Sequence, residues 1–529
     1  MDLARFLAED KRGVGLPDRM ASLNGFFSAI LDSDGATFLA VDRVRSYPLF
    51  YSITDGEILV SDDARLILKE IGGGNASRIS ASELLCAGYV TGNETLIDAI
   101  RQVRPGEVVR LDKSSIQTDP HRYRYFVHRP SNEVTSENER VTSELLDGLD
   151  IATISIFRRL KDFARGRTIV VPLSGGYDSR LIVSTLRTLD CDNVIAFSYG
   201  RKGNIESTIS RRIAGELGYD WFFVPYSIVK WKEWGESPQF KSFFEFSHNL
   251  SSVPHVQDWP ALWELKKQGI IDDDSVIAPG YGGNSQAGGQ LPRSLLARKS
   301  GISNEEIVDY LINRHYGLWG VNRLLSATRV DIERRLSKAL GIEGLHTLSE
   351  ACTICEYWDW AERQSKFCVN AVRSKDFWGV DWWLPFWDKE FFEFWSHAPI
   401  APKIGRSLYR GYVNNRVFEL TGEAIKTSHE SPGLVQSIRL TRAKLPRTPI
   451  SGLGDIIIGT YDLARQYREH PMAWYGLLTK KEFRSVFTGR EHINSFLAMK
   501  LLFSIEREMT LTDFLKIDAA AYQTDRLSE

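Results

Sequence analysis

Hydrophobic and polar positions in the first quarter of the chain form short runs separated by turn residues. The runs alternate or are continuously apolar, and they lie at Gly25 to Asp32, Ala36 to Val41, Leu49 to Ile53, Ile58 to Ser61 and Val108 to Leu111. Asp-Gly pairs at 34–35 and 55–56 interrupt them, and such pairs favour tight hairpin turns. The pattern therefore predicts a β-rich N-terminal domain.

The pattern changes after a polar segment. Residues 129–139 are rich in Ser, Asn and Glu without an apolar period, which is typical of a linker. Apolar positions then recur at helical spacing from Leu145 to Leu160 and lead into Thr168 to Leu173, a β-branched run typical of a strand covered on both faces. Further strand-like runs (194–198, 221–225, 275–278) alternate with helical stretches (178–189, 207–217), which predicts a parallel sheet with right-handed crossovers. Beyond residue 303 the chain reads as mostly helical.

Composition narrows the class of protein. The 529 residues carry 66 Lys and Arg against 68 Asp and Glu, and 43% are hydrophobic, as in an ordinary folded protein. This balance excludes a disordered chain and gives no electrostatic footprint for nucleic acid. Five cysteines are too few for a disulfide framework, and no apolar run reaches the roughly 18 residues of a membrane span. We expect a soluble, cytoplasmic protein.

The strongest chemical signal is Ser174-Gly175-Gly176-Tyr177-Asp178-Ser179, between the predicted buried strand and the next helix. Two glycines allow a ligand to approach the backbone, and the positive end of the helix dipole favours an anion there. Asp178 could hold Mg²⁺ against a phosphate, and the hydroxyls of Ser174 and Ser179 could donate hydrogen bonds. The motif predicts a phosphate site, and its spacing is not that of a Walker loop.

This string resembles the PP-loop of the asparagine synthetase family, whose members adenylate a carboxylate with ATP and pass the acyl group to an amine. Residues 280–289, Gly-Tyr-Gly-Gly-Asn-Ser-Gln-Ala-Gly-Gly, are similar to the family's second pyrophosphate loop, and residues 381–388 to its Glu-x-Arg-x-Pro-Phe-Leu-Asp segment. The resemblance implies ATP and Mg²⁺ as ligands. It assigns nucleotide binding to Ser174, Gly175, Gly176, Asp178, Ser179, Gly280, Gly282 and Gly283, and metal binding to Asp178 and Asn284.

The front of the chain resembles a class II glutamine amidotransferase domain. The resemblance lies in residues 23–27, in Asp42-Arg43 with residues 48–51, in Ser61-Asp62 and in residues 105–107. In that domain the nucleophile is a cysteine directly after the initiator Met, with its own α-amine as the base. Position 2 here is Asp2, the segment before Leu23 is short, and Cys86 lies far along the chain. We therefore expect no glutaminase chemistry.

Within the family, a lost cysteine resembles the β-lactam synthetases, which use an amine already present on the substrate. Tyr281 stands where those enzymes carry a catalytic tyrosine, and Asp381 is the carboxylate we expect beside it as a general base pair. Other positions depart from the family: Asn284 replaces an acidic metal ligand, Ser285 a Glu and Trp383 an Arg. The register places Ser431 where the family has a lysine that stabilises pyrophosphate, with Lys426 and Lys444 as possible substitutes.

Together these features predict an α/β protein with an Ntn-hydrolase-like β-rich (α+β) front domain at 1–128, a linker at 129–139, a PP-loop synthetase-like parallel sheet at 140–435 and a helical extension at 436–529. The predicted function is an ATP-dependent amide ligase that releases AMP and pyrophosphate. A catalytically impaired nucleotide-binding or scaffold protein and a PP-loop ATPase for RNA thiolation remain alternatives. The expected partners are a small-molecule, peptide or sugar carboxylate and an amine donor, without nucleic acid or membrane, and a homodimer is possible.

Several weaker signals have structural explanations. Cys352, Cys355 and Cys368 are spaced like the start of a metal site but lack a fourth ligand, which favours buried thiols. The basic run from Arg158 to Arg167 is typical of a solvated helix end. His255 and Asp258 precede a predicted helix at the place where relatives line the nucleotide pocket.

Overall fold

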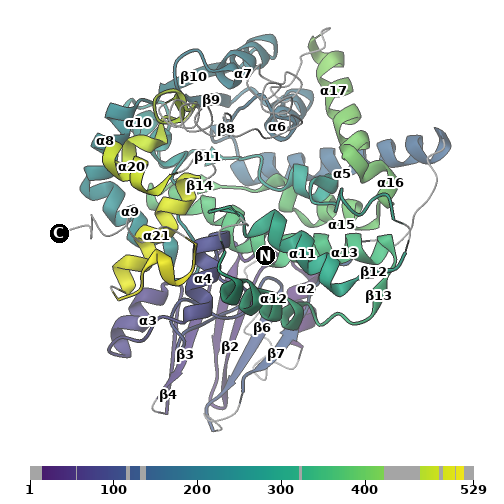
Figure 1. Ribbon diagram of the computed structural model, residues 1–529. Coiled ribbons are helices and arrows are strands. Elements are labelled where there is room, and N and C mark those ends of the chain that lie inside the picture. Colours follow the sequence, from purple (N-terminus) through teal and green to yellow (C-terminus); the bar gives the residue numbers. More distant parts are fainter. Residues whose placement is uncertain are drawn as a thin grey trace, which may run out of the picture.

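The computed structural model describes residues 15–54, 56–114, 119–130, 139–298, 300–320, 324–421, 465–487, 492–506 and 508–516. Two antiparallel sheets near the N-terminus lie below a parallel five-stranded sheet in the view of Figure 1, and helices surround the parallel sheet. The predicted fold class is confirmed: a β-rich front, a parallel sheet and a mostly helical later part. Among the described helices, none is long and apolar enough to cross a membrane.

The front domain is a sandwich of two antiparallel sheets. One contains β1 (Ser28–Asp32), β2 (Ala36–Val41), β6 (Glu107–Asp112) and β7 (His121–Arg124), and the other contains β3 (Phe50–Thr54), β4 (Glu57–Ser61) and β5 (Arg101–Gln102). Strand β2 is buried throughout because its alternate side chains enter two cores. Phe38 packs toward α2 (Leu16–Ser22), and Leu39 packs between the sheets. Helices α3 (Ala64–Glu70) and α4 (Arg78–Ala87) follow β4.

All five strands of the second sheet are parallel, in the order β10-β9-β8-β11-β14. They are β8 (Ile169–Pro172), β9 (Val194–Gly200), β10 (Asp220–Pro225), β11 (Val276–Ile277) and β14 (Asp381–Trp382). The β-branched run of β8 is buried on both faces, with Val171 in one core and Val170 in the other. Strand β8 is at the centre of the sheet, because it pairs with β9 on one side and with β11 on the other.

Helices cover both faces of the parallel sheet. On one face α5 (Glu139–Ala164), α6 (Tyr177–Thr188), α7 (Ile205–Glu216), α15 (Lys389–His397) and α17 (Ser407–Thr421) share a core. On the other face lie α8 (Ile228–Glu236), α9 (Pro238–His248), α10 (Trp259–Lys267) and α14 (Arg373–Phe377). The amphipathic period that predicted a helix before β8 is confirmed by Leu149, Ile156 and Leu160 of α5, which all enter the first core.

The remaining described elements are mostly helical and connect the sheet to the front domain. They are α11 (Asn304–His315), α12 (Ser326–Leu340), α13 (Leu348–Trp358), α16 (Ile400–Lys403), α20 (Lys480–Val486), α21 (Ile493–Ile505), the short strands β12 (Ile302–Ser303) and β13 (Leu345–His346), and the helical turns η1 (Ser285–Gly289), η3 (Asp359–Cys368), η4 (Val369–Val372), η5 (Pro385–Trp387), η6 (Ile404–Arg406), η8 (Trp474–Leu477) and η9 (Leu511–Asp513). Strands β5, β7 and β14 and helices α3 and α4 were absent from the sequence prediction. The two-residue strands are too short to show a period.

A buried lysine joins the front domain to the later part of the chain. Lys366 of η3 is fully buried, and its ammonium donates to the carbonyls of Val90 at 2.9 Å and Gly92 at 2.6 Å and to Glu362 at 2.6 Å. A buried charge is tolerated only when it is paired and hydrogen-bonded. The front domain is therefore fixed against the η3, η4 and α14 segment.

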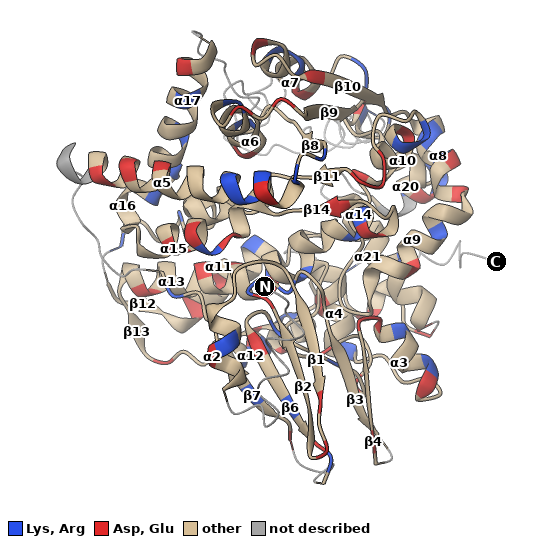
Figure 2. Ribbon diagram, turned by 180° about the vertical axis from the view of Figure 1, so that it is seen from behind, with Lys and Arg blue, Asp and Glu red and all other residues tan. Residues whose placement is uncertain are grey.

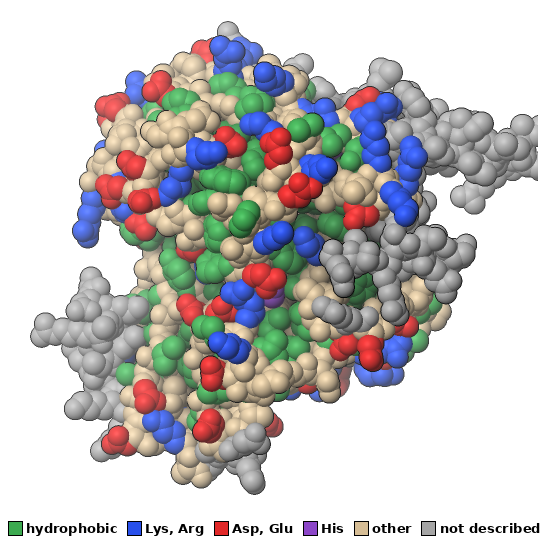
Figure 3. Space-filling view, turned by 90° about the vertical axis from the view of Figure 1, so that its left-hand side faces the viewer, with side chains coloured by type: hydrophobic (Ala, Val, Ile, Leu, Met, Phe, Trp, Pro, Cys, Tyr) green, Lys and Arg blue, Asp and Glu red, His purple; other side chains and the backbone are tan. Residues whose placement is uncertain are grey.

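Charge is mixed along the surface. On α5 in Figure 2 acidic residues lie in the first half of the helix and basic residues mostly toward its end, and charged side chains of both signs are scattered among hydrophobic ones on the face in Figure 3. Two residues of the basic run from Arg158 to Arg167 are paired with acids: Arg159 binds Asp388 at 2.7 Å, and Arg167 binds Asp381 at 2.5 Å. The other members, Arg158, Lys161 and Arg165, are exposed, as expected for a solvated helix end.

Candidate active site

The two glycine-rich loops meet at the carboxyl edge of the parallel sheet. Residues 174–176 follow β8, and residues 278–284 follow β11, its neighbour. Strand order changes direction between these two strands, because the chain moves from β8 to β9 on one side and reaches β11 on the other. Open α/β sheets bind ligands in the crevice at such a switch point. The sheet topology therefore brings the predicted loops together.

The first loop is held by its own side chains. The amide of Ser174 donates to the hydroxyl of Ser179 at 3.0 Å, and the amide of Gly176 donates to the hydroxyl of Ser174 at 3.1 Å. The amide of Gly175 donates to the carboxylate of Glu206 at 2.5 Å. One loop amide thus already binds an anionic group. Gly176, the N-cap of α6, contributes no side chain, so the helix start is open to an anion.

Asp178 lies at the centre of the site. Its carboxylate accepts hydrogen bonds from the amide of Asn284 at 3.0 Å and the hydroxyl of Tyr409 at 2.8 Å. Burial raises the pKa of Asp178 to about 6, against the opposing effects of these two hydrogen bonds and of Arg406. A carboxylate whose charge is this poorly compensated is suited to bind a cation.

The glycines of the second loop permit close packing around Asp178. A Cβ at Gly280 would lie 3.0 Å from the Cβ of Asp178, and one at Gly283 would lie 2.7 Å from the Tyr409 hydroxyl. Gly282 has a φ of +103°, and a Cβ there would lie 2.6 Å from the Trp387 ring. Side chains at these positions would therefore push the second loop away from the first.

These features fit the nucleotide and metal that the resemblance implies. The open start of α6 suits a phosphate, and Asp178 suits Mg²⁺, which prefers carboxylate oxygen and phosphate ligands. Within the described ranges, no three His, Cys, Asp or Glu side chains are grouped to hold a metal. A metal at Asp178 would thus take most of its ligands from a bound phosphate and water.

The hydroxyl of Tyr281, in the second loop, belongs to a buried charged cluster. It donates to Asp258 at 3.0 Å and accepts from Lys375 of α14 at 3.2 Å. Lys375 is fully buried and donates to the same Asp258 carboxylate oxygen, and Ser374 donates to the other oxygen at 3.0 Å. Burial, then the charge of Asp258, raises the pKa of Tyr281 well above its usual value, so the phenol stays protonated.

The expected pairing of Tyr281 with Asp381 is wrong. Asp381 pairs in register with Val276, and Val276 with Ile169, so Asp381 lies at the start of the sheet, opposite the edge that carries the loops. Its side chain is 55% exposed and binds Arg167. Asp258 takes the place expected for Asp381, and the 381–388 segment reaches the second loop through Trp387 instead.

Asn284 is in the site, but its side chain is engaged. The carboxamide oxygen accepts a hydrogen bond from the guanidinium of Arg406, while the backbone amide binds Asp178. The oxygen expected to bind a second metal is therefore held by a cation. Ser285, beside it, donates to the buried Asp359.

Sequence reasoning missed Lys375, Arg406 and Tyr409. Lys375 lies in Arg373-Ser374-Lys375-Asp376, among other charged and polar residues, so no local pattern distinguishes it in the sequence. Arg406 and Tyr409 lie more than a hundred residues beyond the second loop, and they reach it only because η6 and α17 fold back over Asp178. Lys426, Ser431 and Lys444 lie outside the described residues.

The structure also shows the surroundings of the cysteines and of His255, which the sequence singled out as weaker candidates. Cys352 and Cys355 are buried, and burial raises the pKa of the Cys368 thiol, as expected for structural cysteines. His255 packs on Phe367 with ring centroids 4.4 Å apart, and burial lowers its pKa to about 4. Neutral His255 therefore contributes packing beside the Asp258 cluster.

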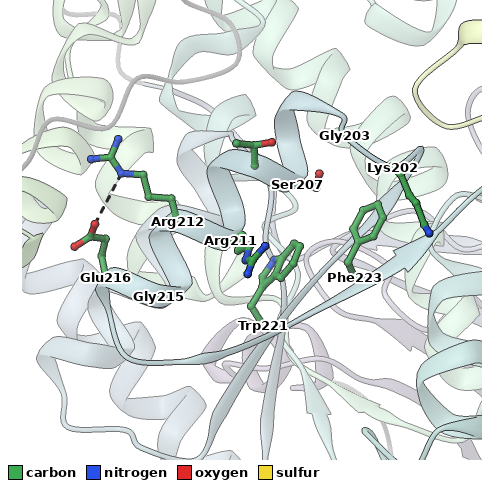
Figure 4. Close-up of a pocket in the computed structure, with 10 residues that line it drawn as sticks. Lys202, Gly203, Ser207, Arg211, Arg212, Gly215, Glu216, Trp221 and Phe223 are labelled. Atoms are coloured by element: carbon green, nitrogen blue, oxygen red, sulfur yellow. Dashed lines mark ion pairs between the residues drawn. The ribbon is translucent and has the colours of Figure 1, made fainter.

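A large open pocket lies apart from this chemistry. It measures about 810 Å³ and is formed by α7 and β10, with Trp221 and Phe223 on its floor and Arg211 and Arg212 at its sides (Figure 4). Its acid, Glu216, lies 3.8 Å from Arg212. None of the site residues predicted from the sequence lines it.

Comparison with known proteins supports the interpretation of the front of the chain. Residues 9–124 match the family model described as a glutamine amidotransferase domain. No curated protein matches the chain. The matched range covers both antiparallel sheets, so the sandwich is the counterpart of that domain's fold. The chain thus carries a front domain of the glutamine amidotransferase type.

Proposed function

We propose that the chain is an ATP-dependent amide ligase of the asparagine-synthetase type, which adenylates a carboxylate, releases pyrophosphate and transfers the acyl group to ammonia or a substrate amine. One observation carries the proposal: two glycine-rich loops meet at the switch point of a parallel sheet around Asp178. The glutamine amidotransferase-type front domain supports the same class of enzyme. The 174–179 loop and the start of α6 would bind the triphosphate, and Asp178 would hold Mg²⁺.

We assign the proton transfer in this reaction to Tyr281. An amine nucleophile must lose a proton as it attacks the activated carbonyl. The phenol oxygen can accept that proton while its own proton passes to Asp258, 3.0 Å away. Lys375 donates to both groups and keeps them aligned. The raised pKa of Tyr281 favours this relay over a free tyrosinate.

The proposed reaction is tested by its products. The purified chain, supplied with Mg²⁺-ATP, hydroxylamine as a general amine and a panel of amino acid, peptide and uronate carboxylates, should release AMP and pyrophosphate with the matching carboxylate. Tyr281→Phe should spare exchange of labelled pyrophosphate into ATP while slowing amide formation by about 100-fold, the usual contribution of a general base. Release of ADP and phosphate, or silence with every carboxylate, would contradict the proposal.

We further propose that this chain does not hydrolyse glutamine. A nucleophilic cysteine needs an exposed, activated thiol, whereas burial raises the pKa of all five thiols in the chain. Cys86, the one cysteine of the front domain, is fully buried in its core. Incubation with glutamine, with and without ATP, should leave glutamate at background in an enzyme-coupled assay. Glutamate formed in proportion to protein would refute this.

A further inference from the structure

Three arginines, Arg293, Arg406 and Arg410, lie close together beside the second loop. Arg406 of η6 donates to the Asn284 carboxamide oxygen, and Arg410 of α17 donates to the Tyr177 hydroxyl at 3.1 Å. Burial, Arg410 and Arg293 all lower the pKa of Arg406, so the three positive charges are close together. Asp178 opposes this effect on the pKa of Arg406, so its carboxylate also lies near the guanidinium.

The backbone at Arg406 has an energetically unfavourable conformation. Arg406 has a φ of +63°, a left-handed conformation that residues other than glycine rarely adopt, and it follows Gly405 at +64°. Such strain persists where the surroundings enforce it, commonly at functional sites. The surroundings here are the buried Lys403–Glu356 ion pair at 2.7 Å and the approach of Gly288, where a Cβ would lie 2.3 Å from the Lys403 carbonyl oxygen.

The guanidinium of Arg406 has spare donor capacity at the site. Its Nε is buried without a hydrogen-bond partner among the described residues, and its contact with Asn284 is to a neutral oxygen. A buried unpaired donor is costly, and a ligand that accepts its hydrogen bond would recover that cost. Phosphate oxygens are suitable acceptors for a guanidinium fork.

We infer that Arg406, with Arg410 and Arg293 beside it, binds the pyrophosphate part of ATP and supplies the positive charge that a second Mg²⁺ would otherwise bring. This inference rests on the proposed function, since it assigns the residues that hold the leaving group of that reaction. Asn284 then acts as a neutral support for Arg406. A carboxylate at position 284 would bind the guanidinium itself and compete with the phosphate.

Calorimetry on the full chain with Mg²⁺-pyrophosphate, Mg²⁺-ATP and AMP tests the inference. Arg406→Gln should weaken pyrophosphate and ATP by about 10- to 100-fold, the usual range for a lost charge-assisted hydrogen bond, and leave AMP unchanged. Arg406→Lys should retain part of the affinity. Arg187→Gln, on the exposed end of α6 in an ion pair with Asp192, is the matched control and should bind like the wild type.

A compensating variant separates the role of charge from that of shape. Asn284→Asp combined with Arg406→Gln should regain affinity for pyrophosphate as Mg²⁺ is raised, because the new carboxylate can hold a second metal ion. Pyrophosphate binding unaffected by Arg406→Gln, equal losses for AMP and pyrophosphate, or no recovery in the double variant would overturn the inference. A wild type that binds neither ATP nor pyrophosphate would instead contradict the proposed function.

Discussion

Replacing Asp178 with Asn should weaken Mg²⁺-ATP binding by about 100-fold or more, since even indirect partners of a metal ligand contribute 10- to 100-fold to metal affinity. Asn keeps the shape of the side chain and one acceptor oxygen for Tyr409 or the Asn284 amide, so the loops should stay folded. The loss should be seen in calorimetry with Mg²⁺-ATP and be smaller with ATP in EDTA.

Asp192→Asn provides the control for that experiment. The Asp192 side chain is 88% exposed and lies beyond the far end of α6, where it binds Arg187. This variant should bind Mg²⁺-ATP like the wild type, and both variants should retain the wild-type thermal midpoint within a few degrees. Equal affinities of Asp178→Asn and the wild type for Mg²⁺-ATP would contradict the assignment of Asp178 as a metal ligand.

Replacing Lys375 with Met should destabilise the protein by about 3 to 5 kcal/mol, the usual cost of removing one partner of a buried ion pair. The variant leaves Asp258 with a negative charge, 1% exposed, and removes the donor that bridges Asp258 and Tyr281. Met has a similar volume, so the effect comes from charge and hydrogen bonding more than from a cavity. Thermal unfolding followed by circular dichroism measures the change.

Two further variants show whether the unpaired charge is the cause. Lys389→Met removes a surface lysine that lies 3.8 Å from Glu393, and it should change stability by less than about 1 kcal/mol. Asp258→Asn combined with Lys375→Met should recover much of the loss, because the buried charge is gone. Similar unfolding midpoints for Lys375→Met and Lys389→Met would contradict a stabilising role of the buried Lys375–Asp258 ion pair.

The interpretation of Tyr281 depends on this cluster. If Lys375→Met remains folded at low temperature, Tyr281 loses a donor and Asp258 loses its cation. The relay in the proposed mechanism would then be impaired at the amine step, with ATP binding at the 174–179 loop intact. A structural role alone would instead affect both steps together.

The longer strands and the two glycine-rich loops could be predicted from the sequence. The mostly apolar run of β2 and the β-branched run of β8 reflect burial on both faces of a sheet, which is a local property. The glycines at 175–176 and 280–283 and the carboxylate of Asp178 could be recognised because close backbone approach and metal binding demand those residue types. In the described structure, residues 174–176 and 278–284 form loops after two neighbouring strands, and their binding of nucleotide and metal stays a prediction.

Tertiary structure decided which side chains meet at the loops. Asp381 is the first residue of the 381–388 segment that carries the family resemblance. Strand register nevertheless places it at the edge of the sheet opposite the two loops. Asp258, Lys375 and Arg406 come from three separate segments, and the pairing of β8 with β11 and the return of η6 and α17 over Asp178 bring them to the site. Spacing along the chain carries no information on such contacts, because they depend on strand order and on helices folding back from distant segments.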